Sequence, residues 1–249
     1  MIRQSILQTV DVVKRYGDGE TAVLALRGVT CEIYSREFVS LAGPSGSGKS
    51  TLINMLGGLE KPDDGSVLLN AVDLAGLASN ELAYLRAQEV GYIFQNLNLN
   101  SAKTILENVT LPILHAGLPP EEADLQAATL LEFVGLGDRI HHRPCDLSVS
   151  QQIHVAIARA FANKPSIILA DEPTGPLNSQ EGQKIVEILR ALNSEHGVTI
   201  VSATHDQKML AASDRVFHIQ DGQMTSIETR KKLFVEAELH LCSSGSWDA

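Results

Sequence analysis

The sequence predicts an α/β fold with a parallel sheet at its centre, an N-terminal antiparallel β subdomain and an inserted α-helical subdomain. Residues 1–42 are rich in β-branched and aliphatic residues and are punctuated by glycines, which is typical of strands joined by turns. Residues from 164 onward alternate short apolar runs with helical patterns, which indicates a parallel sheet with right-handed crossovers. The intervening residues, 96–163, carry mostly helical spacing.

Local patterns of hydrophobicity and turn residues define the individual elements. Gly57 and Gly58 are expected to end the first helix, and Pro119 and Pro120 mark the start of a later one. We expect strands over residues 6–13, 22–26, 29–33, 38–42, 91–94, 166–170 and 198–203. We expect helices over residues 49–56, 81–88, 102–109, 120–134, 150–163, 181–193 and 207–213.

These elements are expected to form one domain of 249 residues. Its α/β core, including the N-terminal β portion, comprises residues 1–95 and 164–229, and the helical subdomain comprises residues 96–163. Residues 230–249 form a C-terminal extension, with a polar end that we expect to be frayed. Its charged part, residues 230–241, is either a packing helix or a partner contact.

Composition excludes several classes of function. A formal net charge of -10 argues against a general nucleic-acid-binding protein, which needs clustered Lys and Arg to contact phosphates. The three cysteines, Cys31, Cys145 and Cys242, show no metal-binding spacing and are expected to be reduced thiols. No signal peptide or membrane-spanning segment is expected, so any work at a membrane requires a partner.

One glycine-rich segment carries the strongest chemical signal. Residues 43–50 fit the pattern GxxxxGK[ST] between an apolar strand and a helix, the context of a P-loop NTPase core. In such a loop, backbone N–H groups and the helix N-terminus face phosphate, Lys49 reaches the β- and γ-phosphates and Ser50 contacts Mg²⁺. The alternative is a chance glycine turn before a helix. The predicted ATP-binding residues of this segment are Gly43, Pro44, Ser45, Gly46, Ser47, Gly48, Lys49, Ser50 and Thr51.

Polar residues also follow three buried strands. Asp171 and Glu172 follow the strand at 166–170, and His205 follows the one at 198–203. Ligands bind at the carboxyl ends of strands in an open α/β sheet, so Asp171 is a candidate metal ligand and Glu172 a candidate for orienting or deprotonating water. Gln95 follows residues 91–94 and is a candidate ligand of metal or water. The alternatives are a solvated turn for the two acids and a structural role for the histidine.

The chain resembles the nucleotide-binding subunits of ABC transporters over residues 6–224. In this resemblance Gln95 is the Q-loop residue, Asp171 and Glu172 form Walker B and His205 is the switch histidine. Leu147 and Ser148 open the signature, residues 155–160 (VAIARA) continue it, and Tyr16 is the aromatic that stacks on adenine. The sequences of residues 94–99 (FQNLNL) and 169–175 (LADEPTG) are similar to those of one branch of the family, the lipoprotein-release, macrolide-export and cell-division ATPases.

That resemblance implies an ATPase, with ATP and Mg²⁺, that couples hydrolysis to movement of integral membrane permease subunits. It implies a dimer with a second nucleotide-binding subunit, identical or different, at the cytoplasmic side of the inner membrane, and no nucleic-acid partner. It also implies that the region around residues 96–110 forms a groove for a coupling helix of the membrane subunit. Lys103 and Glu107 there, four residues apart, are equally compatible with a solvated helix face.

Two motifs depart from the family. The signature LSGGQ reads Leu147-Ser148-Val149-Ser150-Gln151, so Ser148, Val149, Ser150 and Gln151 would offer a facing site a bulkier loop, without the φ freedom of glycine. The D-loop ends in Asn178 in place of an acid, Ile153 and His154 replace Gln and Arg, and Arg36 and Ala71 occupy positions where turn glycines are usual.

These departures leave three hypotheses open. In the first, the chain is an active ATPase that powers transport, with lipoproteins or other envelope molecules as substrates, as the resembling branch implies. Alternatively, it is an ATP-gated binding or scaffold subunit with weak or no hydrolysis. A third arrangement is an asymmetric heterodimer whose other subunit supplies an intact signature.

Overall fold

The computed structural model describes residues 4–230. The expected C-terminal extension, apart from Arg230, and Cys242 lie outside the described residues. Cys31 and Cys145 are both free thiols, as expected. Within residues 4–230, none of the helices combines the length and the apolar character that crossing a bilayer requires.

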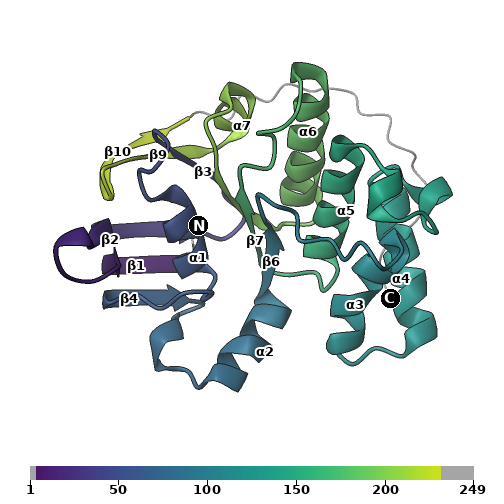
Figure 1. Ribbon diagram of the computed structural model, residues 1–249, viewed down its shortest axis with the longest axis horizontal. Coiled ribbons are helices and arrows are strands. Elements are labelled where there is room, and N and C mark those ends of the chain that lie inside the picture. Colours follow the sequence, from purple (N-terminus) through teal and green to yellow (C-terminus); the bar gives the residue numbers. More distant parts are fainter. Residues whose placement is uncertain (1–3, 231–249) are drawn as a thin grey trace.

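The central sheet has six strands in the order β10-β9-β3-β8-β7-β6 (Figure 1). β6 (Val90–Ile93), β7 (Ile167–Asp171), β8 (Thr199–Ala203), β3 (Phe38–Ala42) and β9 (Arg215–Gln220) run parallel, and β10 (Gln223–Thr229) pairs antiparallel with β9. The predicted parallel core is therefore confirmed. The sequence analysis did not predict the hairpin of β9 and β10. Its residues follow a short helix, and polar residues interrupt the apolar run that would indicate a strand.

A second, antiparallel sheet has the order β2-β1-β4-β5, with β1 (Ser5–Tyr16), β2 (Val23–Tyr34), β4 (Asp64–Leu69) and β5 (Val72–Asp73). The two strands expected at 22–26 and 29–33 are wrong as separate elements, because they form the single strand β2. Gly28 has φ 78° and lies where the β1–β2 register shifts, so it bends the strand without ending it. β4 and β5 were not anticipated.

Seven α-helices cover the described chain: α1 (Lys49–Leu56), α2 (Ser79–Glu89), α3 (Ile105–His115), α4 (Pro120–Phe133), α5 (Val149–Phe161), α6 (Ser179–Glu195) and α7 (Gln207–Ala212). Short 3-10 turns occupy Gly19–Thr21, Leu74–Gly76, Gly137–Arg139 and Pro144–Asp146. Figure 1 shows α3, α4 and the start of α5 grouped at the side of the central sheet, away from the N-terminal sheet. The largest difference from prediction is α3, which begins three residues later than expected and continues through Pro112.

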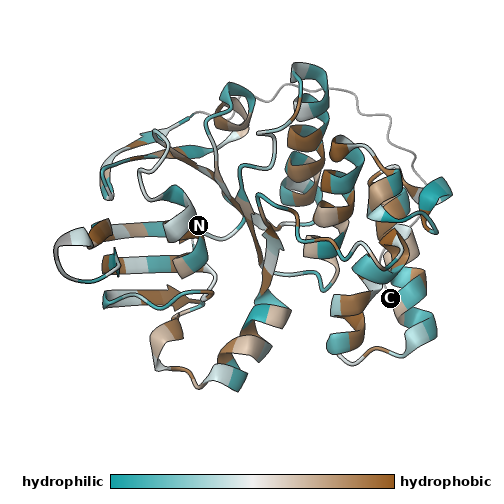
Figure 2. Ribbon diagram, in the orientation of Figure 1, coloured by the Kyte–Doolittle hydropathy of each residue, from teal (hydrophilic) through white to brown (hydrophobic). Residues whose placement is uncertain are grey.

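Alternate residues of the central strands supply two different cores. Phe38, Ile168 and Ile200 belong to a cluster with α3–α6, whereas Val39 and Val201 belong to a cluster with α1 and the antiparallel sheet. This is the period-2 alternation of a sheet that is buried on both faces. Figure 2 shows the brown, apolar strands of this sheet running through the middle of the molecule. Both layers therefore hold the carboxyl ends of β3, β7 and β8 in fixed positions.

In two turns, residues other than glycine adopt the left-handed backbone conformation. Arg36 and Ala71 both have φ 64°, and Asn70, beside Ala71, has φ 49°. Glycine is the residue best suited to such conformations, which agrees with the family pattern noted for both positions.

Candidate nucleotide-binding site

The glycine-rich loop joins β3 to α1 and folds tightly against neighbouring backbone. A Cβ on Gly43 would lie 2.1 Å from the Ile219 carbonyl oxygen, and one on Gly48 would lie 2.5 Å from that of Ala25. Gly48 also has φ 101°. Both positions therefore require glycine for steric reasons, and Gly48 requires it for its backbone conformation as well.

Lys49 is largely buried and closes the loop on itself. Its ammonium group donates to the carbonyl oxygens of Gly43 and Pro44, both at 2.9 Å. Within residues 4–230 its hydrogen-bond partners are these two neutral carbonyls, so a phosphate oxygen in the loop would be a stronger partner. The ammonium group of Lys49 thus lies beside the place where the P-loop pattern predicts that phosphate binds.

Beside the loop, the hydroxyl of Ser50 on α1 donates to Asp171 Oδ1 at the end of β7, at 3.0 Å. Burial raises the pKa of the Asp171 carboxyl, and the neighbouring Glu172 adds to this, while the bond from Ser50 and the charge of Lys49 oppose it. A partly buried carboxylate with incomplete compensation is a site where a cation would be favourable. The structure thus brings together the two residues expected to contact metal.

Glu172 and His205 meet at the ends of β7 and β8. Glu172 has φ 47°, and its N–H donates to the Ala203 carbonyl at 2.8 Å, which turns its side chain toward His205. His205 Nδ1 lies 3.1 Å from Oε1, its hydrogen-bond partner, and 2.9 Å from Oε2. Oε2 is shielded from solvent and has no hydrogen bond of its own. His205 therefore contacts both oxygens of the Glu172 carboxylate at the edge of the site.

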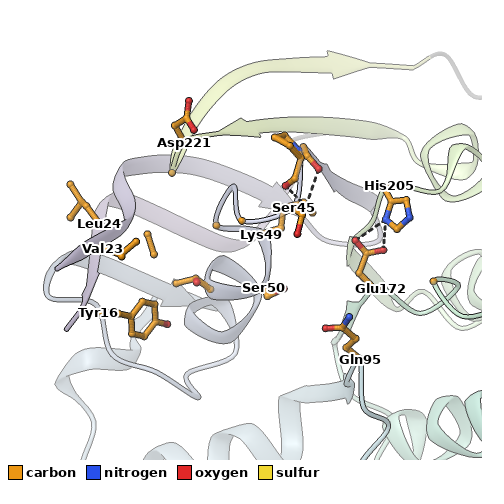
Figure 3. A pocket seen from close by; sticks show the side chains of 18 of the residues that line it. Tyr16, Val23, Leu24, Ser45, Lys49, Ser50, Gln95, Glu172, His205 and Asp221 are labelled. Carbon is orange, nitrogen blue, oxygen red and sulfur yellow. Dashed lines mark hydrogen bonds and ion pairs between the residues drawn. The ribbon is translucent and has the colours of Figure 1, made fainter. Parts of the chain in front are cut away.

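These residues surround one open cavity of about 1190 Å³. Figure 3 shows Tyr16 at one end, Glu172, His205 and Gln95 at the other, and Lys49 and Ser50 between them. Of the expected residues, Ser47 and Asp171 lie behind its wall, and residues 148–151 and Asn178 are not part of its lining. Lining residues that sequence reasoning did not assign to the site are Val23, Leu24, Ala25, Arg27, Asn96, Gly175, Pro176, Asp221 and Gly222.

Most of these additional residues come from β2 and from the β9–β10 turn. Gly222 N–H donates to the Ser47 carbonyl, and Arg27 N–H donates to the Gly222 carbonyl, at 3.0 and 2.8 Å. The turn is therefore hydrogen-bonded both to the glycine loop and to the antiparallel sheet. No local motif marks it, because its place at the site depends on the pairing of distant strands.

Tyr16 stands at the mouth of the cavity with 41% of its surface exposed. Its hydroxyl donates to Glu60 at 2.5 Å, and the Lys14 ammonium lies 5.6 Å from the ring centroid. Partial burial and, next, the bond to Glu60 raise the pKa of this phenol, which stays neutral. The ring is held by its edge, and a face remains available for a flat partner.

The signature segment starts α5. Ser148 caps the helix by accepting from Gln151 N–H, and Gln151 accepts in return from Ser148 N–H. Val149 is helical and half exposed, and neither it nor Ser150 has a positive φ. This chain therefore makes no use of the φ freedom of glycine at these two positions, because the first helical turn requires none. Only the bulk of the Val149 side chain distinguishes it here.

The D-loop residue Asn178 caps α6. Its side-chain oxygen accepts from the N–H groups of Gln180 and Glu181, each at 3.0 Å, and its amide donates to the Glu181 carboxylate at 2.7 Å. An aspartate could provide the same cap but not the third bond. Asn178 is thus structurally satisfied within this chain.

Comparison with known proteins agrees with this site. A family profile described as ABC transporter matches residues 26–175. An uncharacterized ABC transporter ATP-binding protein of Thermotoga maritima is 47% identical over 227 residues, which are 91% of this chain and 97% of that protein. The macrolide export ATP-binding/permease protein MacB of Brucella melitensis is 43% identical over 92% of this chain, but the chain spans only 35% of its length.

Solved structures give the same result. The dimeric bacterial ABC transporter cassette MJ0796 has a TM-score of 0.85 and 40% identity, with 90% of this chain and 98% of that chain covered. Its post-hydrolysis dimer bound to ADP and Pi aligns equally well. The CbiO1 protein of Clostridium perfringens, part of the transporter complex CbiONQ, has a TM-score of 0.81 at 28% identity, over 94% of this chain and 92% of that chain.

The chain belongs to the ABC transporter family. It is an ATP-binding ATPase subunit of that family, and the predicted α/β cassette with antiparallel and helical portions is confirmed.

Proposed function

We propose that this chain couples ATP hydrolysis to movement of integral membrane permease subunits, at the cytoplasmic side of the inner membrane. The observation that carries the proposal is the convergence of Lys49, Ser50, Gln95, Glu172 and His205 on one cavity. Export of an envelope molecule, such as a lipoprotein or a macrolide, is the favoured work, since the relatives include macrolide export proteins.

Each part of ATP has matching groups along this cavity. The exposed face of Tyr16 suits the adenine ring, and residues 43–51 with the ammonium of Lys49 suit the phosphates. Ser50 and Asp171 offer hard oxygen ligands that fit Mg²⁺, with Gln95 as a third. Bound there, Mg²⁺ would neutralise phosphate charge. The partly buried Asp171 carboxylate and the Lys49 ammonium, whose hydrogen-bond partners are two neutral carbonyls, support this assignment.

Hydrolysis needs a water molecule aligned with the γ-phosphate. Glu172 lines the cavity, and its carboxylate would orient or deprotonate that water. His205 contacts both oxygens of that carboxylate and would contact the γ-phosphate, and Gln95 would position water without adding charge. Positioning of the water and neutralisation of the phosphate charge would then supply most of the rate enhancement of ATP hydrolysis.

A groove supports the proposed membrane partner. A hollow of about 360 Å³ lies between the end of β6 and helices α3 and α5, and its walls include Phe94, Leu111 and Pro112. We expect this hollow to accept an apolar helix of a permease subunit. Lys103 and Glu107 form an exposed ion pair of 3.2 Å at the start of α3. Neither residue lines this hollow, which favours the alternative that they belong to a solvated helix face.

The second proposed partner is another nucleotide-binding subunit, identical or different, since the solved cassette MJ0796 is dimeric. In that arrangement, residues 148–151 and Asn178, which do not line the cavity of their own chain, would face the partner's nucleotide.

The decisive experiment measures ATP turnover of the chain purified with its membrane partner. Glu172→Gln should abolish turnover while leaving ATP binding intact, and Glu187→Gln, on the exposed face of α6, should leave turnover unchanged. Turnover that survives Glu172→Gln would remove the role assigned to Glu172.

One observation favours a second function, an ATP-gated scaffold with slow hydrolysis. The half-exposed Val149 side chain adds bulk at the surface offered to the partner. Replacing both Val149 and Ser150 by glycine should raise turnover substantially if this bulk limits the reaction. Equal turnover before and after the change would mean that the segment does not limit hydrolysis.

A further inference from the structure

A partly buried arginine links the helix that begins at the signature to the loop that follows Gln95. Arg159 lies in the last turn of α5, and its guanidinium donates to the carbonyl oxygens of Asn98, at 2.7 Å, and Leu97. Burial lowers the pKa of this group. Within residues 4–230 no carboxylate forms an ion pair with it, so its desolvation is offset chiefly by these two carbonyls.

The loop that the arginine holds is conformationally strained. Leu97 has φ 52° and Asn98 has φ 49°. Leu97 N–H donates to the Phe94 carbonyl at 2.9 Å, and Asn98 N–H donates to the Asn96 carbonyl at 2.5 Å. Two successive left-handed residues with side chains persist only where their surroundings hold them in place. The two carbonyls that Arg159 binds belong to these same two residues.

A second side chain holds the far end of the loop. Asn108 on α3 accepts from Asn100 N–H at 2.7 Å and donates to the Asn100 and Thr104 carbonyls at 3.1 and 2.8 Å. Asn108 is 2% exposed, so this contact is fixed to the core of the helical subdomain. Residues 97–100 are therefore tied to α5 by Arg159 and to α3 by Asn108.

Gln95 itself remains free of such bonds within the described chain. It is exposed, lines the nucleotide cavity and lies near Glu172 (Figure 3). Its position is set by its own short strand, β6, on one side and by the strained turn on the other. Any shift of α5 relative to the central sheet acts on that turn through the guanidinium.

We propose that Arg159 is the positioning residue for Gln95, clamping the turn at Leu97 and Asn98 so that α5, which starts at Ser148, and the catalytic glutamine move together. The proposal rests on the role proposed above for Gln95. It assigns to Arg159 a mechanical link between the surface offered to a partner subunit and the water or metal ligand of this chain's own site.

The clamp is tested first without any activity, by hydrogen–deuterium exchange of the full chain. Arg159→Met should speed exchange in the peptide covering residues 94–100 by about tenfold or more, as expected for loss of a charge-assisted hydrogen bond. Arg159→Lys, which keeps the charge but cannot span two carbonyls, should change exchange in the same direction and provides a variant that keeps the buried stem.

The matched control is Arg230→Met, since Arg230 also donates to a backbone carbonyl, that of Leu210, remote from the loop. This control should leave exchange in residues 94–100 unchanged. Unchanged exchange there in both Arg159 variants, or an equal rise across the whole chain, would overturn the clamp.

The consequence for catalysis is tested in the complex with the membrane partner. Arg159→Met should lower kcat by about tenfold or more while KM for ATP stays within about twofold, because misplacement affects the chemical step more than binding. Gln95→Ala should lower kcat too, and the double variant should be no slower than the slower single variant.

The outcomes separate the two proposals. If Gln95→Ala leaves kcat unchanged, the role proposed for Gln95 fails, while the exchange experiment still decides the clamp. If Gln95→Ala lowers kcat but the effects of the two substitutions multiply, Arg159 acts independently of Gln95 and the positioning role is overturned.

Discussion

Replacing Ala71 by glycine should stabilise the protein. Ala71 lies in the turn between β4 and β5 with φ 64°, next to Asn70 with φ 49°. Both residues are exposed, so removing the methyl group sacrifices no core packing. Two successive positive φ angles are characteristic of a tight hairpin turn in which the second position favours glycine.

The magnitude follows from two opposing terms. A residue with a side chain in the left-handed region costs about 1–2 kcal/mol. Glycine loses more backbone entropy on folding than alanine, which removes about 0.5–1 kcal/mol of the gain. The net increase in the free energy of unfolding is about 0.5–1 kcal/mol, and the expected rise in Tm is about 1–4 °C for a chain of this length.

Urea unfolding with a fixed slope provides the assay. Ala22→Gly is the matched control, because Ala22 has φ -63° and gains nothing from glycine. It should lower the free energy of unfolding by about 0.5–1 kcal/mol. If Ala71→Gly behaves like Ala22→Gly, the left-handed strain assigned to this turn is refuted.

Two further predictions concern buried polar groups. Tyr92→Phe should raise the free energy of unfolding by about 1 kcal/mol in thermal or urea unfolding, since the Tyr92 hydroxyl is buried without a hydrogen-bond partner in the described structure; a loss of stability would indicate an undetected partner. His154 donates to the Val134 carbonyl, and burial lowers its pKa below the ordinary 6.5, so the unfolded chain binds this proton more readily. Stability should therefore fall as the pH falls through 6.5 toward the lower folded pKa, and the fall from pH 7.5 to 5.5 should be smaller in His154→Asn; an equal fall in both proteins would contradict it.

Prediction from the sequence succeeded where a signal is local. The helix α1 has the predicted bounds, Lys49–Leu56. Its start follows from the P-loop pattern and the apolar strand before it, and its end follows from the paired glycines after it. Gly57 is needed for a reason that is not local, because a Cβ there would lie 1.3 Å from the Tyr92 hydroxyl oxygen. The sequence marks the glycine, but only the packing of β6 against α1 explains it.

Prediction failed where tertiary pairing decides. Arg27 and Gly28 predict a break between two strands. In the structure β2 continues through both residues, because its pairing with β1 resumes after a shift in register. The turn at Asp221 and Gly222 joined the site through hydrogen bonds to Ser47 and Arg27, which no spacing in the sequence reveals. At Val149 the residue type was informative, but the reasoning from φ did not apply to a helical position.

We propose that the cavity between Tyr16 and Glu172 is an ATP site built around Lys49. Equilibrium binding of MgATP to the purified chain, measured by isothermal titration calorimetry, tests it most directly. Lys49→Ala should weaken binding by about tenfold or more, the loss expected for one charge-assisted contact. The control Lys103→Ala, in an exposed ion pair outside the cavity, should bind as the unaltered chain does. Binding that is unaffected by Lys49→Ala, or no binding to the unaltered chain, would contradict the claim.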